Sequence, residues 1–322
     1  MPEDRKAARA AEARRHIATM NVVFAEQTKA SAAAATVYKE GAGRSLDVPA
    51  PRFEVTRAQT LRIDAVEAVM GIAGEHPAVL DFASFTNPGG GYDRGAWAQE
   101  EALCAGSNLF SVLEACKPFY EGNRSMWRGG LFTDKCMYVP GVMFGEGNAI
   151  RPAGVVVCAA PNRRRALENG RDEVEVDHDL ARRVECVMRV AAAQGVDGLV
   201  LGAFGCGVFG NDATRVAGLF KEWLDAHPGV FENVVFAVPG GPNAAAFEEA
   251  FPRIVESEPQ DKGAQADPGE DEEDSTDDWR AYMTAGAADG EDGAAADDTD
   301  DTGAGGSSPK EEWRRKLASF KN

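Results

Sequence analysis

The sequence predicts an α/β protein in which helices pack against a mixed, largely parallel β-sheet. Two observations favour this fold class. Short apolar runs that suit buried strands alternate with amphipathic segments that suit helices of about a dozen residues. In addition, two glycine-rich segments directly follow such runs, as ligand-binding loops do at the carboxyl ends of strands in α/β sheets.

Six apolar runs, bounded by Gly, Pro or polar residues, are expected to form strands: Phe53–Thr56, Val79–Phe85, Cys136–Met143, Gly154–Ala160, Gly198–Phe204 and Val234–Val238. Helical spacing of apolar residues predicts helices over Leu61–Ala73, Ala102–Cys116, Asp179–Gln194 and Ala244–Val255. A further helix is expected to begin after Asn211 and Asp212, which are good N-cap residues.

Composition divides the chain into three segments. Residues 1–51 are predicted to be an N-terminal helical extension, because positions 3–35 are rich in Ala, Arg and Glu. In this segment Ile17, Met20, Val23 and Phe24 repeat at helical spacing, which predicts packing onto the fold. A helix that binds a partner is the alternative. Residues 52–256 carry the α/β pattern and are expected to form the functional domain.

Residues 257–322 form an acidic tail. The whole chain has a net charge of −18, and this segment holds 19 acidic and 7 basic residues, a net of −12. Large apolar residues are few in it, so a packed core cannot form and disorder is expected. The last stretch, Pro309–Asn322, has a mixed-charge helical pattern. It fits a motif that folds on a partner or a solubilising tail, and both interpretations stay open.

Several classes of protein are not favoured by the composition. No span approaches 18 uninterrupted apolar residues, and the N-terminus lacks the apolar core of a secretory signal, so an intracellular protein without a membrane helix is expected. The six cysteines form no Cys-x-x-Cys pair and are expected to be reduced thiols. The four histidines show no metal-ligand spacing, so we expect neither a protein-bound metal nor a cofactor.

The most informative stretch is Asn87–Glu101, which follows the predicted strand Val79–Phe85. Its glycine triplet, Gly89, Gly90 and Gly91, lacks Cβ atoms and can present successive N–H groups to an anion such as a diphosphate. After a gap of seven residues, Tyr92–Ala98, come Gln99, Glu100 and Glu101, expected in the first turn of a helix. The glycine triplet alone fits an ordinary loop, and the glutamate pair alone fits a solvated helix face. Together, after a buried strand, they indicate a phosphate-binding loop beside a carboxylate pair.

A second glycine-rich loop, Gly205–Gly210, has the spacing Gly-x-Gly-x-x-Gly. Dinucleotide-dependent redox chemistry is not favoured, because the next strand ends in Pro239-Gly240-Gly241 without a ribose-binding carboxylate. The loop can still hold a diphosphate at a helix N-terminus. A third feature, the basic run Arg163–Arg165, either faces solvent or meets a phosphate.

These two loops together resemble the microbial-type poly(ADP-ribose) glycohydrolases of the macrodomain superfamily. The glycine triplet, the Gln-Glu-Glu and the Gly-Cys-Gly-Val-Phe-Gly occur in the order found in that family. The resemblance covers roughly Arg52 to Val255 and implies a three-layer macrodomain sandwich, with helices on both faces of the sheet. It does not explain the acidic tail.

The resemblance implies exo-hydrolysis of ribose–ribose bonds in poly(ADP-ribose), with release of ADP-ribose. Glu101 would be the general acid and then the base that activates water. Glu100 would bind the hydroxyls of the adjacent ribose, and Gln99 would orient the pair. Asn87 would either bind the distal ribose or cap its turn.

Both loops would bind the diphosphate, through Gly89–Gly91 and Gly205–Gly207. Phe209 would pack against the terminal ribose, with Val208 beside it, in the loop that also contains Cys206, Gly207 and Gly210. Asn243 and Phe247 are candidates for the adenine end. Asp93–Arg94 departs from the family pattern of an apolar residue and an asparagine, and Arg94 would pair with Asp93 or touch a substrate phosphate.

Two other functions use the same features. A macrodomain that binds ADP-ribose without cleaving it needs both glycine loops but no adjacent glutamates. The same site geometry also permits a hydrolase that removes a single ADP-ribose from a protein or a small-molecule ester. We expect poly(ADP-ribose), ADP-ribose and ADP-ribosylated proteins as partners of a monomer, with no direct binding of nucleic acid and none of membranes.

Overall fold

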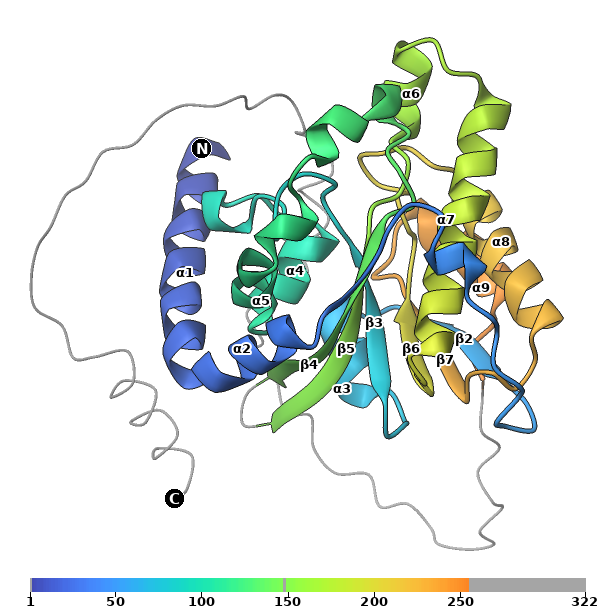
Figure 1. Cartoon of the computed structure of the whole chain (residues 1–322), viewed down its shortest axis with the longest axis horizontal. Coiled ribbons are helices and arrows are strands. Elements are labelled where there is room, and N and C mark those ends of the chain that lie inside the picture. Colours follow the sequence, from blue (N-terminus) through green and yellow to red (C-terminus); the bar gives the residue numbers. More distant parts are fainter. Residues whose placement is uncertain (1, 147–148, 255–322) are drawn as a thin grey trace, which may run out of the picture.

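A seven-stranded sheet forms the middle layer of the computed structural model, which describes residues 2–146 and 149–254 (Figure 1). The strands are β1 (Thr36–Tyr38), β2 (Arg57–Leu61), β3 (Pro77–Phe82), β4 (Cys136–Glu146), β5 (Ala149–Cys158), β6 (Gly198–Leu201) and β7 (Asn233–Ala237). Their order across the sheet is β1-β4-β5-β3-β6-β7-β2. Neighbours from β5 to β2 pair in parallel, whereas β4 is antiparallel to both of its neighbours.

Helices cover both faces of this sheet (Figure 1). They are α1 (Pro2–Val23), α2 (Ala25–Ala33), α3 (Ala65–Gly71), α4 (Gln99–Ala105), α5 (Leu109–Ala115), α6 (Arg163–Glu168), α7 (Glu173–Ala193), α8 (Ala213–Ala226) and α9 (Pro242–Ala250). Single 3₁₀ turns are η1 (Gly43–Ser45), η2 (Tyr92–Arg94), η3 (Lys117–Phe119), η4 (Asn123–Met126) and η5 (Arg128–Gly130). The expected mixed α/β sandwich is confirmed.

The alternation of side chains along the central strand β3 divides the core in two. Ala78 and Leu80 belong to the core beneath α7, α8 and α9, whereas Val79 belongs to the core beneath α3, α4 and α5. All three side chains are fully buried. A strand with helices on both faces must be apolar on both, which explains the continuous apolar runs of the sequence.

Several predicted elements differ from the structure in place or extent, three of them most clearly. The segment Phe53–Thr56 is not a strand; β2 begins at Arg57. Because β2 lies at the sheet edge and alternates polar and apolar residues, it carries no apolar run. The helix expected from Leu61 begins only after Asp64, whose side chain accepts the N–H groups of the first turn. The helix expected over Ala102–Cys116 is divided between α4 and α5.

The N-terminal segment packs on the fold, as its helical spacing predicted. Ala13 and Phe24 are buried, and Ile17 packs against the core beneath α3, α4 and α5. Figure 1 shows α1 along the outer side of α4 and α5. The segment also supplies β1, an edge strand that the sequence did not predict. The division at residue 51 stays a prediction.

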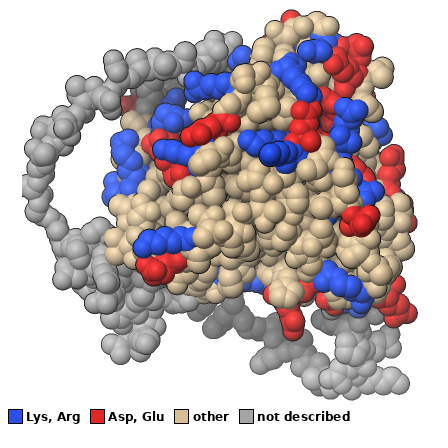
Figure 2. Space-filling view, in the orientation of Figure 1, with Lys and Arg blue, Asp and Glu red and all other residues tan. Residues whose placement is uncertain are grey.

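Charges of both signs are interspersed on the face of the molecule shown in Figure 2. This agrees with the moderate net charge of the chain before residue 257. Among the helices of residues 2–146 and 149–254, none is long and apolar enough to cross a membrane. The predicted acidic tail and its terminal helical pattern lie outside the described residues.

Candidate active site

The first glycine loop connects the carboxyl end of β3 to the N-terminus of α4. Gly89 and Gly90 both have φ +63°, a left-handed conformation that favours glycine. The loop closes through hydrogen bonds from Gly90 N–H to the Asn87 carbonyl (3.1 Å) and from Tyr92 N–H to the Gly89 carbonyl (3.1 Å). These turns bring the glycine backbone back over the first turn of α4.

Glu100 and Glu101 lie in that first turn, as predicted, and both meet the backbone of Gly90. A Cβ atom at Gly90 would lie 2.5 Å from Glu101 Oε1 and 2.9 Å from Glu100 Oε2. Gly91 donates its N–H to Glu101 Oε1 at 2.9 Å. Glu100 is 4% exposed and Glu101 6% exposed. The loop therefore covers two buried carboxyl groups, and only a glycine fits between its backbone and their oxygens.

Backbone groups of β3 and the residues after it hold the other side of this pair. Ser84 donates its N–H to Glu100 Oε2 at 2.6 Å. Gln99 binds the strand twice: its Oε1 accepts the Phe82 N–H at 2.9 Å and its Nε2 donates to the Leu80 carbonyl at 2.8 Å. Gln99 thus attaches the N-terminus of α4 to β3.

Asp81 is a third carboxyl group of the site, and it was not among the residues predicted from the sequence. It lies on β3, is fully buried, and has no hydrogen-bond partner among the described residues. Burial, and then the charge of Glu101, raise the pKa of Asp81 well above its usual value. Burial, and then the charge of Asp81, raise the pKa of Glu100 in the same direction. A single acid within an otherwise apolar run was the available signal.

The second glycine loop follows β6, the parallel neighbour of β3. Gly205 and Gly210 both have φ +72°, and a Cβ at Gly205 would collide with the Asn211 amide and, at 2.6 Å, with Ala160. Gly207 has open space around it. Asp212, one of the two predicted cap residues, caps α8 by accepting the Arg215 N–H at 2.7 Å.

Three aromatic rings connect the two loops. Phe85 from the first loop stacks on Phe132, with ring centroids 4.7 Å apart. The ring centroid of Phe132 lies 6.1 Å from that of Phe209 in the second loop. Phe209 is partly buried against this cluster, whereas Val208 beside it is 64% exposed. The loops therefore lie side by side at adjacent strand ends, as the sequence analysis required.

Other candidates from the sequence lie as follows. Cys206 is partly buried, and burial raises the pKa of its thiol to about 12. Arg94 pairs with Asp93 at 3.3 Å and donates to the Gly90 carbonyl at 2.9 Å, so it supports the first loop. Phe247 is fully buried against Phe236, with 5.4 Å between ring centroids, and so cannot contact adenine.

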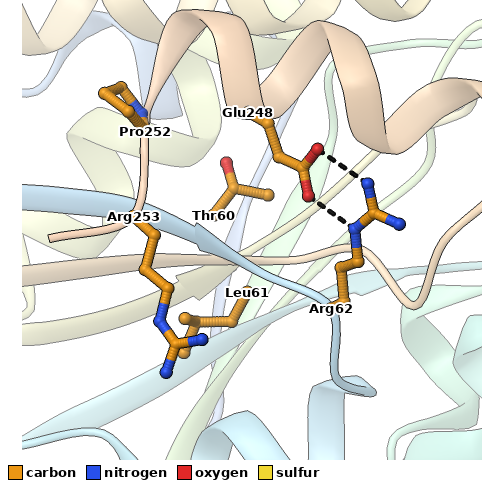
Figure 3. Close-up of a pocket in the computed structure, with 6 residues that line it drawn as sticks. All are labelled: Thr60, Leu61, Arg62, Glu248, Pro252 and Arg253. Carbon is orange, nitrogen blue, oxygen red and sulfur yellow. Dashed lines mark hydrogen bonds and ion pairs between the residues drawn. The ribbon is translucent and has the colours of Figure 1, made fainter. Parts of the chain in front are cut away.

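An open pocket of about 360 Å³ lies elsewhere, at the outer edge of the sheet between β2 and α9 (Figure 3). Figure 3 shows Arg62 and Glu248 joined by two hydrogen bonds, of 2.6 and 2.9 Å, within it. This ion pair satisfies both charges, and Glu248 is the one carboxylate among the residues that line the pocket. In the part of the chain that the structure describes, no cluster of His, Cys, Asp or Glu could hold a metal ion.

Comparison with known proteins points to one family. The model of the microbial-type PARG catalytic domain, where PARG denotes poly(ADP-ribose) glycohydrolase, matches residues 6–145. The crystal structure of PARG from Thermomonospora curvata is 32% identical, with a TM-score of 0.66, over 74% of this chain and all of that one. A second structure of that protein contains the inhibitor ADP-HPD (33% identity, TM-score 0.64, the same coverage).

The PARG from Deinococcus radiodurans in complex with ADP-ribose is also similar. It is 33% identical, with a TM-score of 0.63, over 69% of this chain and 96% of that one. Among curated proteins no match is found. The residues matched by the family model include the first glycine loop and the glutamate pair.

Proposed function

The chain belongs to the microbial-type poly(ADP-ribose) glycohydrolases, and from this premise we propose that it cleaves ribose–ribose bonds of poly(ADP-ribose) and releases ADP-ribose from the chain end. The observation that supports this most directly is the pair of buried glutamates beneath Gly90, beside two loops suited to a diphosphate. Solved relatives contain ADP-ribose or ADP-HPD.

We assign the proton transfers to Glu101. Its carboxyl group donates a proton to the glycosidic oxygen as the bond to the anomeric carbon breaks. The carboxylate then takes a proton from water as the water oxygen attacks the oxocarbenium-like carbon. This step returns the Glu101 carboxyl group to its protonated form. Burial and mutual charge raise the pKa of the neighbouring Asp81 and Glu100, so protons are held within the carboxyl groups beside Glu101, which supports this role.

The other predicted residues have roles that fit their positions. Glu100, held by the Ser84 N–H, would bind the hydroxyls of the ribose at the cleaved bond. Gln99 would act through the backbone of β3, by fixing the start of α4 relative to the sheet. Phe209, supported by Phe132, would limit the rotation of the terminal ribose so that the reacting atoms stay aligned.

Incubation of the protein and a Glu101→Gln variant with poly(ADP-ribose) tests this proposal. We expect free ADP-ribose from the parent, none from the variant, and similar binding of ADP-ribose by both. Glu222→Gln, an exposed change on α8, is the matched control and should retain full activity. Equal turnover by the Glu101 variant would remove this residue from the mechanism.

Two further measurements address the alternatives. A protein that only binds ADP-ribose would release nothing from the polymer, whatever its affinity. A hydrolase specific for single units would release ADP-ribose from mono-ADP-ribosylated protein but leave the polymer intact.

Phe209→Ala should lower turnover more than it lowers ADP-ribose affinity.

We also propose that the enzyme acts inside the cell as a monomer. The six free thiols, five of them buried, fit a reducing compartment. Light scattering of the purified chain measures its mass in solution and tests the second part of this statement.

A further inference from the structure

Two exposed arginines lie beside the three aromatic rings that connect the glycine loops. These are Arg124 in η4 and Arg164 in the first turn of α6. They come from segments about 40 residues apart in sequence, one beside Phe209 and the other beside Phe85. Neither belongs to the glutamate pair or to the glycine loops.

Arg164 lies along the second glycine loop. Its backbone N–H donates to the Phe209 carbonyl at 3.1 Å. The Cγ atom of its side chain is 3.3 Å from the position that a Cβ would take at Gly210. The side chain of Arg164 therefore starts at the edge of the second glycine loop, which is suited to the substrate diphosphate.

Arg124 is held beside the first loop by its neighbours. Asn123 is fully buried and donates its Nδ2 to the Phe85 carbonyl at 2.7 Å. Met126 packs against the cluster of Phe85 and Phe132. The turn that carries Arg124 is thus fixed to the end of the first loop, while the arginine side chain itself is exposed.

The charge of these two arginines, like that of Arg165, is not neutralised within the described residues, whereas the charges of Arg163 and Arg128 are. Arg163 pairs with Glu173 and Asp177, and Arg128 pairs with Glu40. Across residues 2–146 and 149–254, neither Arg124 nor Arg164 has an ion pair or a side-chain hydrogen bond. Two free guanidinium groups beside one site suit a phosphate-bearing ligand, to which arginine donates two parallel hydrogen bonds.

We propose that Arg124 and Arg164 bind the diphosphate of the polymer unit next to the one held by the glycine loops. The inference rests on the proposed function. Each unit of poly(ADP-ribose) carries one diphosphate, and the two glycine loops account for only one. A chain that crosses Glu101 must place its next diphosphate outside the loops, where these two arginines lie unpaired beside the connecting rings.

The test compares polymer with single ADP-ribose units. In Arg124→Gln/Arg164→Gln, KM for poly(ADP-ribose) at low salt should rise about tenfold, since exposed charge pairs contribute roughly two- to fivefold each. The slope of log KM against log salt should fall by about 0.7 for each arginine, as expected for contacts to a single-stranded polyanion. Inhibition by ADP-ribose, which fills only the loops, should not change.

Lys221→Gln removes one charge from the second half of α8, where Lys221 pairs with Asp225, and is the control. It should leave both KM and the salt slope unchanged. With Lys in place of Gln at position 124, part of the affinity of the parent for poly(ADP-ribose) should return. Melting temperatures of all variants show that they are folded. Parent-like KM and slope in the double variant would overturn the inference.

A second outcome would also overturn it. If the double variant loses affinity for ADP-ribose itself, the arginines belong to the first diphosphate and there is no second subsite. Failure of the proposed function is distinct from both, because the unsubstituted protein would then release no ADP-ribose from the polymer.

Discussion

Replacing Gly90 by alanine perturbs the site without removing any group that takes part in the reaction. The added methyl group would lie 2.5 Å from Glu101 Oε1 and 2.9 Å from Glu100 Oε2. Carbon and oxygen atoms cannot approach so closely, so both carboxyl groups must move away from the loop or the loop must rise. Either shift would break the proposed alignment of Glu101 with the sugar of the substrate.

Two separate costs follow from this geometry. The left-handed conformation, φ +63° at Gly90, costs a residue with a Cβ about 1–2 kcal/mol of folding free energy. The displacement of the carboxyl groups, by up to about an ångström, should lower kcat/KM by roughly 100-fold. The loss of activity should therefore exceed what the loss of stability explains.

Gly195→Ala separates these two costs. Gly195 follows α7 and has φ +72°, and a methyl group added there would meet no other atom within 4 Å. Its replacement should cost the same free energy of unfolding, measured by urea denaturation, and leave the release of ADP-ribose unchanged. Comparable activity in Gly90→Ala and Gly195→Ala would show that the carboxyl groups tolerate displacement and would refute a requirement for their exact placement.

Three other substitutions test the surroundings of the site. Tyr92→Phe removes a hydroxyl group that lies 3.0 Å from His16 Nδ1. Its free energy of unfolding, measured in urea, should be about 1 kcal/mol lower than that of the parent. Its kcat should also be lower, whereas its affinity for ADP-ribose should be unchanged. Because burial raises the pKa of Asp81, folding of the parent should weaken as pH rises above about 4, the unfolded-state value. Asp81→Asn should thus be more stable than the parent at pH 8 and equally stable near pH 4, although it should lose activity; parallel stability curves would contradict this. Asp64→Ala removes the N-cap of α3 and should lower the melting temperature by the equivalent of about 1 kcal/mol, without effect on turnover.

The central sheet was predictable because its strands are buried on both faces. The cores of β3, β5, β6 and β7 carry continuous apolar residues, and such runs can be read locally. Where each strand ends was predicted less well, since the predicted strands for β3, β5 and β6 extended past the observed end into the following loop. Strand ends depend on the neighbouring strand, which a single segment does not reveal.

Elements that depend on distant partners could not be predicted. The division between α4 and α5 lies at Ser107–Asn108, where Asn108 binds the backbone N–H of Met143 at 2.8 Å and the Thr28 hydroxyl at 2.9 Å. The edge strand β1 owes its conformation to pairing with β4. The break between α4 and α5 had a local signal in Gly106-Ser107-Asn108, a helix stop followed by N-cap residue types, whereas the local composition does not specify β1.

The same distinction applies to the site. The glutamate pair and the glycine triplet were found because they are close in sequence and share one strand–loop–helix unit. The Tyr92–His16 hydrogen bond joins positions 76 residues apart, so only the folded chain shows that α1 supports the first loop. Asp81 was missed because an acid in an apolar run indicates a buried site only when its neighbours are known.

The three carboxyl groups cannot be explained by stability. Asp81 lacks any hydrogen-bond partner within residues 2–146 and 149–254, as does one oxygen of Glu100, and burial of such groups opposes folding. Backbone donors nevertheless hold the oxygens of Glu100 and Glu101 that face Gly90. An arrangement that weakens the fold and directs carboxyl oxygens toward the first glycine loop supports the catalytic use proposed for Glu101.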